Sequence, residues 1–252
     1  MKRIVGYVLL GLCAYLVFLV LQFPVGALAH YLATYLPGLQ VQHIEGSIVQ
    51  GRALGLNVRG VELESLAWRW QPLSLLGGRF EYRFSIMEPQ LKLQGRAGVG
   101  LDQQLRIVDL DGEVSLNKAI AMAVRAQLPV NGKVEVELAE LRIGADGLPR
   151  AVYGTTRLLD ARTTLGRTLN LGDFSTELTT EKQGIVGTVR DIGGPLEMIG
   201  TLTLAPNGHY RFNGQVGVRD DNNQELRQVL SLLGRVGTDG KWSIDFTGML
   251  KV

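Results

Sequence analysis

The chain has 252 residues, of which 46% are hydrophobic, 20% are charged and 32 are glycine. This apolar share is ordinary for a globular protein and excludes a disordered chain, and the glycines follow no Gly-X-Y period, which excludes collagen. The net charge of +2 comes entirely from Lys2 and Arg3, because the chain from residue 30 onward carries 24 basic and 24 acidic side chains. Since no concentrated cationic face is present, nucleic acid is not expected as a partner.

The N-terminus predicts a transmembrane anchor. After Lys2 and Arg3, residues 4–23 form a nearly continuous apolar run, which as a helix would span about 30 Å, the thickness of the hydrocarbon core. The two charges before the run predict a single-pass protein with a cytoplasmic N-terminus and its bulk on the far side. The alternative is a cleaved signal peptide, with Ala27-Leu28-Ala29 as the peptidase site. Under both interpretations, the rest of the chain is exported across the membrane.

The pattern along the chain predicts three parts: a cytoplasmic tip with its anchor (1–24), a membrane-proximal helix or linker (25–45), and a β domain (46–252). The helical spacing of the second part stops at Pro37-Gly38, a strong breaker pair. A weak seam at 128–132 does not divide the β domain.

Period-two alternation dominates from residue 46 onward, for example over 79–86, 134–138 and 242–246. Such alternation predicts antiparallel strands with one buried and one wetted face, here eleven or twelve of them. Glycine-containing pairs between the runs predict turns. The predicted turns are at Gly77-Gly78, Asp111-Gly112, Asn131-Gly132, Asp146-Gly147, Gly193-Gly194-Pro195, Asn207-Gly208 and Asp239-Gly240.

Two helices are expected among the strands, over 115–125 and 223–234. In the second, Asn222 or Asn223 would cap the N-terminus, with Leu226, Leu230 and Leu233 on the apolar face and Gly234 at the end. The predicted fold is therefore mainly β: one elongated, curved antiparallel sheet, an open roll or half-barrel, with one or two short helices.

The sequence contains no recognisable catalytic or metal-binding pattern. The three histidines lie far apart, and the single cysteine, Cys13, lies inside the apolar run, which rules out zinc sites built from cysteine and histidine. Carboxylates mostly occupy the solvent-facing positions of the strands, and Asp220-Asp221-Asn222-Asn223 is interpreted as a loop and helix cap. We therefore expect no enzymatic activity, no catalytic residues, no cofactor and no metal.

Residues 46–80 carry a pattern of glycine, proline and aromatic residues that resembles a known family. Gly46-Ser-Ile-Val-Gln-Gly-Arg-Ala53 is followed by Leu66-Ala-Trp-Arg-Trp-Gln-Pro-Leu73 and by Leu75-Leu-Gly-Gly-Arg-Phe80, and Asn207-Gly-His-Tyr-Arg-Phe-Asn-Gly214 fits the same family. The pattern resembles protein N of the type II (general) secretion pathway. Val49 is a departure, because this family often has tryptophan there.

The resemblance implies a non-catalytic component of the bacterial inner membrane, with its bulk in the periplasm, that assists the export of folded proteins. Other type II secretion components would be its partners. The residues it singles out as fold-defining or partner-docking are Trp68, Trp70, Pro72, Gly78, Arg79 and Tyr210. The family also resembles AsmA-like proteins, which implies an alternative: a periplasmic lipid-handling or envelope-maintenance protein that binds acyl chains in a β-groove.

Overall fold

The computed structural model describes residues 39–250, apart from 59–60, 101, 125–128, 166, 221 and 233–235. The predicted anchor over 4–23 and the helix expected near 25–36 lie outside these residues. No helix in the described part of the chain is long and apolar enough to cross a membrane. The first strand begins at Leu39, within the segment that the sequence assigned to the linker.

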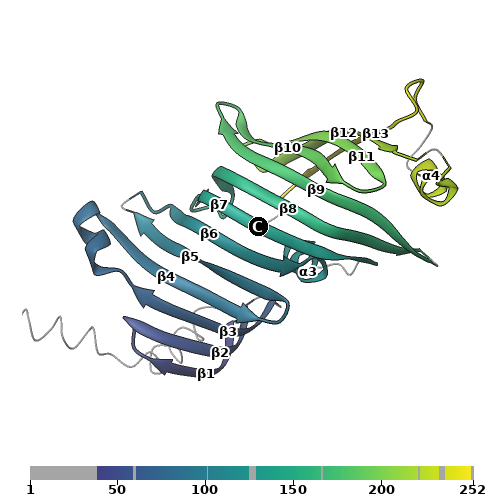
Figure 1. The fold of residues 1–252 in the computed structure, drawn as a ribbon. Helices are drawn as coiled ribbons and strands as arrows, with labels where there is room; N and C mark the ends of the chain where they lie inside the picture. The colour runs from purple at the N-terminus through teal and green to yellow at the C-terminus, as the bar shows by residue number, and fades with distance from the viewer. Residues whose placement is uncertain are drawn as a thin grey trace, which may run out of the picture.

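Among the described residues, one antiparallel sheet contains all of the strands, and each strand pairs with its neighbour along the chain (Figure 1). The mainly β prediction is confirmed, with 13 strands rather than eleven or twelve. In chain order they are β1 (Leu39–Gly46), β2 (Gln50–Val58), β3 (Val61–Trp70), β4 (Arg79–Glu88), β5 (Leu91–Gly100), β6 (Leu105–Ser115), β7 (Val130–Ile143), β8 (Pro149–Leu165), β9 (Arg167–Glu181), β10 (Gly184–Gly193), β11 (Leu196–Leu204), β12 (His209–Val218) and β13 (Trp242–Met249).

The register places most apolar side chains on one face of this sheet. Residues directly opposite each other in an antiparallel pair share a face, and rows such as Leu66, Ile86 and Leu93 cross β3, β4 and β5. The next residues along the same strands, Ala67, Ser85 and Gln94, form the neighbouring row on the other face. The alternation in the sequence therefore becomes an apolar face and a polar face.

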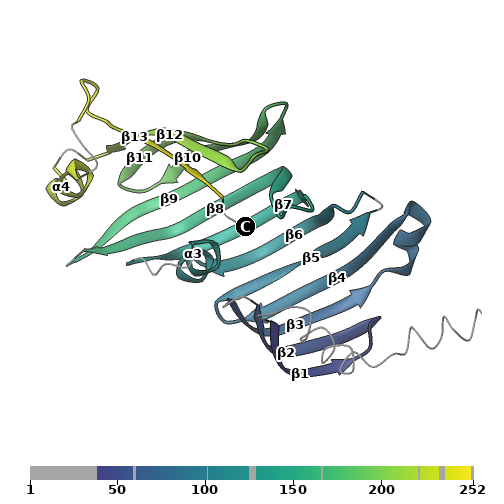
Figure 2. The same ribbon diagram turned by 180° about the vertical axis from the view of Figure 1, so that it is seen from behind.

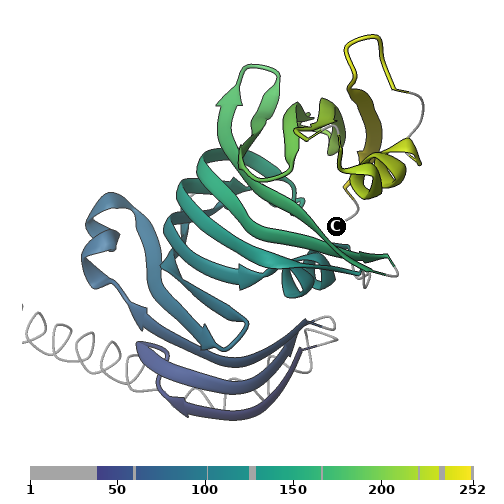
Figure 3. The same ribbon diagram turned by 45° about the vertical axis from the view of Figure 1, so that its right-hand side comes forward.

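The sheet curls into an open trough, and both helices lie on its inner side (Figure 3). Helix α3 (Leu116–Val124) packs on β6 and β7, as the view from behind also shows (Figure 2), and its Ala119 contacts a core cluster that contains Leu91 and Val114. Helix α4 (Gln224–Ser231) covers the C-terminal strands. The apolar face is thus the concave face, and we call it the inner face.

Both predicted helices are confirmed. Asn223 caps α4, and its side-chain oxygen accepts a hydrogen bond from the backbone N–H of Leu226 at 3.2 Å. Leu226 and Leu230 are buried in one cluster with Leu196, Val216 and Trp242. The predicted Leu233 and Gly234 lie outside the described residues.

Two of the predicted turns are wrong. Asp111-Gly112 lies inside β6 and Asn131-Gly132 lies inside β7, and the strand pairing shifts between Asn131 and Lys133. Gly112 has a φ of +152°, and a Cβ there would lie 1.9 Å from the carbonyl oxygen of Lys92. A glycine with positive φ can therefore occur inside a long strand, at a bulge or where two backbones come close, as well as in a turn.

A buried ion pair fastens α3 to the inner face. The Glu88 carboxylate is almost fully buried and pairs with the ammonium of Lys118 on α3. The same carboxylate accepts the backbone N–H of Glu64 at 2.6 Å. Glu88 therefore joins β4, β3 and α3 at one point, and removing its cation would leave a buried charge that only the Glu64 N–H stabilises.

We expect Lys118→Met to destabilise the protein by about 3 kcal/mol, because it leaves the Glu88 carboxylate unpaired in the core. Urea unfolding of the full chain, followed by near-ultraviolet circular dichroism, measures this change. The matched control is Lys133→Met, which removes surface pairs with Glu113 and Glu135 and should move the midpoint far less. Equal shifts in the two variants would show that the Glu88–Lys118 pair is not a structural anchor.

Candidate interaction surfaces

The inner face is only partly covered by α3 and α4. Beneath α4 and α3 the side chains are buried, and a third buried cluster of Leu138, Val152 and Ile185 lies in the middle of the sheet. Elsewhere the inner face is half-exposed, and Phe80, Val99 and Phe246 are each close to half accessible. A large apolar face that the described residues leave open is a candidate docking surface.

Aromatic rings on the inner face lie over glycines of the neighbouring strands. A Cβ at Gly51 would come within 2.4 Å of the Trp68 ring, and one at Gly248 within 2.3 Å of the Tyr210 hydroxyl oxygen. The Trp68 indole N–H donates to the Ser47 carbonyl oxygen at 3.2 Å, which ties β3 to the β1–β2 turn. At these two positions the absence of a Cβ makes room for an aromatic side chain of the neighbouring strand.

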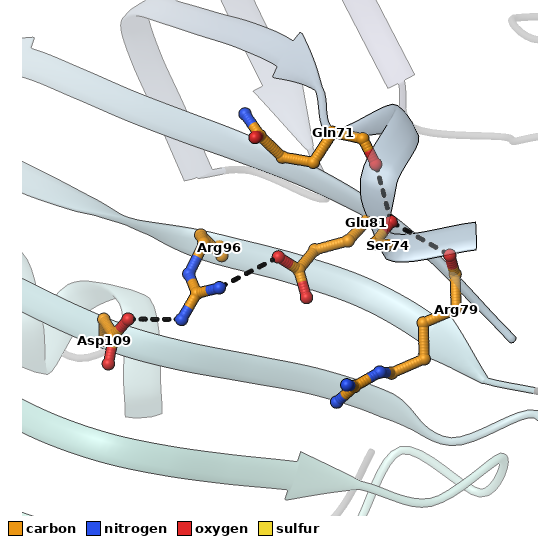
Figure 4. Close-up of polar contacts among 6 residues, drawn as sticks. All are labelled: Gln71, Ser74, Arg79, Glu81, Arg96 and Asp109. Atoms are coloured by element: carbon orange, nitrogen blue, oxygen red, sulfur yellow. Dashed lines mark hydrogen bonds and ion pairs between the residues drawn. The ribbon is translucent and has the colours of Figure 1, made fainter. Parts of the chain in front are cut away.

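The connection between β3 and β4 is a rigid loop around the 3-10 helix η1 (Pro72–Gly77). Pro72 occupies the start of η1, where its fixed φ and missing N–H are suitable. Gly78 ends η1 in the left-handed conformation (φ 68°). The Ser74 hydroxyl donates to the carbonyl oxygens of Gln71 at 2.6 Å and Arg79 at 3.0 Å (Figure 4).

Three aromatic rings lie on the inner face directly behind this loop. The ring centroids of Trp70 and Phe80 are 5.8 Å apart, and those of Phe80 and Tyr82 are 5.3 Å apart in an edge-to-face arrangement. Burial raises the pKa of the Tyr82 phenol above its usual value, so this side chain stays neutral. The cluster continues the apolar surface from the loop onto the inner face.

The polar outer face carries a row of arginines. Arg69, Arg83 and Arg96 are directly opposite one another on β3, β4 and β5, and they line a shallow hollow of about 1000 Å³. Arg96 pairs with Glu81 and Asp109 (Figure 4), and its hydrogen bond to Asp109 raises the pKa of the guanidinium. Like charges directly opposite each other on neighbouring strands are destabilising. The row of arginines therefore lowers the local stability of the sheet, and the pairing of Arg96 with Glu81 and Asp109 reduces this repulsion.

The structure brings five of the six residues singled out from the sequence to one end of the sheet. These five are Trp68, Trp70, Pro72, Gly78 and Arg79 on β3, η1 and the start of β4. Tyr210 does not join them, because it lies on β12 and eight strands separate β12 from β3. There its ring packs edge-to-face on Phe246, with centroids 6.3 Å apart.

Sequence reasoning missed two features of these surfaces. Glu88 continues the alternation of Phe80, Phe84 and Ile86, so its position on the apolar face was visible in the pattern. The row of arginines had no signal along the chain, because only the register places Arg69, Arg83 and Arg96 together. Within the described ranges, no group of three or more histidine, cysteine, aspartate or glutamate side chains is placed to hold a metal ion.

The fold is that of a mainly β protein built on one open, single-layer antiparallel sheet with two short helices in its described part. The family described as type II secretion system (T2SS), protein N, matches residues 37–245. The chain belongs to this family.

Curated relatives agree with this assignment. The chain is 25% identical to type II secretion system protein N of Aeromonas hydrophila, covering 99% of this chain and 100% of that protein. It is also 26% identical to the protein of the same name from Klebsiella pneumoniae, covering 96% and 94% of the two chains, and 25% identical to the one from Vibrio cholerae, covering 99% and 100%. No solved structure gives a significant match.

The packing of Tyr210 over Gly248 predicts a change of sign between two backgrounds. Gly248→Val should destabilise the natural chain by about 1 kcal/mol, because all three of the nearest atoms to a new Cβ belong to Tyr210. In a Tyr210→Ala background the same change should be neutral or stabilising, because valine favours strands. Thermal unfolding of the four proteins measures the coupling. The same sign in both backgrounds would contradict this packing.

Proposed function

We propose that this chain is a non-catalytic component of the type II secretion system that assists the export of folded proteins by binding other components. Residues 4–23 would hold it in the inner membrane, with the sheet in the periplasm. The family assignment supports the secretion role, and Lys2 and Arg3 before the apolar run support this orientation. The observation that carries the binding role is the inner face that α3 and α4 leave partly uncovered.

The binding role can be tested most directly at β13, the strand at the C-terminal edge of the sheet. On β13, Phe246 is half-exposed on the inner face and the next residue, Thr247, is exposed on the outer face. In the described part of the chain, β13 pairs with β12 on one side only. A partner that enters the trough would therefore reach Phe246 and not Thr247.

We expect a thiol-reactive, membrane-impermeant photo-crosslinker to join a Phe246→Cys chain, and not a Thr247→Cys chain, to another secretion component. Both variants carry Cys13→Ser, and the measurement uses actively secreting cells with a permeabilised outer membrane. Failure to label either cysteine would refute the periplasmic placement. Labelling of both without an adduct to a secretion protein would refute binding at the inner face.

A second candidate function is lipid handling at the same face. Trp70, Tyr82 and Ala97 form one apolar row across β3, β4 and β5, and Leu204 and Tyr210 continue the inner face on β11 and β12. A curved apolar surface of this kind suits acyl chains. Lipid binding and partner binding would compete for the same side chains.

We expect Leu202→Asp, on the inner face, to lose any phospholipid that co-purifies with the full chain, because the charge would lie against the acyl chains. Native mass spectrometry of the detergent-extracted protein detects the bound lipid. Thr201→Asp is the matched control, since Thr201 is exposed on the outer face of the same strand. A natural chain that carries no lipid, or equal lipid in the two variants, would exclude this function.

A further inference from the structure

The η1 loop presents three leucines to solvent. Leu73 is 78% exposed, Leu75 is 50% exposed and Leu76 is 89% exposed, and no residue of η1 is buried. Burying a leucine side chain stabilises the buried state, so the three exposed leucines of η1 would gain free energy from being covered. Apolar surface concentrated in this way marks an interaction site.

The loop holds these leucines in place. Pro72 fixes the entry to η1, and Gly78 closes it with its backbone N–H on the Leu75 carbonyl oxygen at 2.9 Å. Ser74 bridges the two ends through hydrogen bonds to Gln71 and Arg79 (Figure 4). Because these hydrogen bonds hold the backbone of the loop in one conformation, the fold itself keeps the three leucines exposed to solvent.

The charges and aromatic residues around the loop indicate what covers it. Between Glu64 and Glu81 the chain has two charged residues, Arg69 and Arg79, and both are cationic. Among the described residues, no carboxylate pairs with Arg79, whose side chain extends along the outer face (Figure 4). Three carboxylates line the same hollow as Arg79: Glu81 and Glu140 pair with other arginines, and Asp102 accepts the backbone N–H of Gln104. Exposed leucines beside tryptophan, phenylalanine and an arginine whose charge no ion pair in the described chain balances form the composition of segments that bind anionic membrane surfaces.

We propose that the η1 loop inserts into the surface of an anionic lipid bilayer. Leu73, Leu75 and Leu76 enter the boundary between headgroups and acyl chains, roughly 5–10 Å deep, and Arg79 contacts lipid phosphate. Trp70 and Phe80 lie directly behind the loop, so the bilayer would meet the open end of the inner face. This contact is separate from the anchor predicted over 4–23 and does not depend on the secretion role.

Depth-sensitive fluorescence tests this contact in the full chain. Leu76→Cys, in a Cys13→Ser background, carries a bimane label, and the protein is reconstituted into phosphatidylcholine vesicles that contain phosphatidylglycerol and a spin-labelled lipid. The matched control is Leu232→Cys with the same label, because Leu232 is 80% exposed and lies beyond α4 on a distant part of the sheet. Both leucines are exposed, so neither change should disturb folding.

We expect the label at position 76 to be quenched several-fold more than the label at position 232. Arg79→Gln should lower the fraction of inserted loop roughly fivefold, because it removes one contact between a cation and the anionic surface. Equal quenching at the two positions would overturn the proposal. So would protection of position 76 that appears only when other secretion components are added, which would assign the loop to a protein partner.

Discussion

One constraint underlies this structure: each of the 13 strands must present its apolar side chains to the same face. A single-layer sheet has no second sheet to cover a misplaced strand, and a one-residue slip in register would invert a whole strand. Irregularities keep the long strands in phase. Asp109 adopts a φ of 49° where the pairing of β5 with β6 shifts, and Gly112 permits the close approach of β5 a few residues later.

The same constraint explains how the sheet is covered. An apolar face that is concave brings the side chains of several strands toward one another, and the cluster of Leu138, Val152 and Ile185 forms in this way without a helix. α3 and α4 cover two further clusters. The Glu88–Lys118 pair adds a polar contact between α3 and the sheet within an apolar surface.

The surfaces that α3 and α4 do not cover differ in their chemistry. The inner face, the arginine row on the outer face and the η1 loop are three surfaces of different chemistry on one thin sheet. Membership of the family of type II secretion system protein N gives these surfaces a setting in which contact with other secretion-system proteins is expected.

Local periodicity and helix signals were enough to predict the mainly β class and the two short helices from the sequence, whereas the structure settled that Asn223 and not Asn222 caps α4. Tertiary structure alone decided that Asp111-Gly112 and Asn131-Gly132 lie inside strands, because a glycine has the same freedom in a turn and in a bulge. It also decided that eight strands separate Tyr210 from Trp68 and that Arg69, Arg83 and Arg96 lie side by side. Those relations depend on strand order and register, which no single segment of the chain contains.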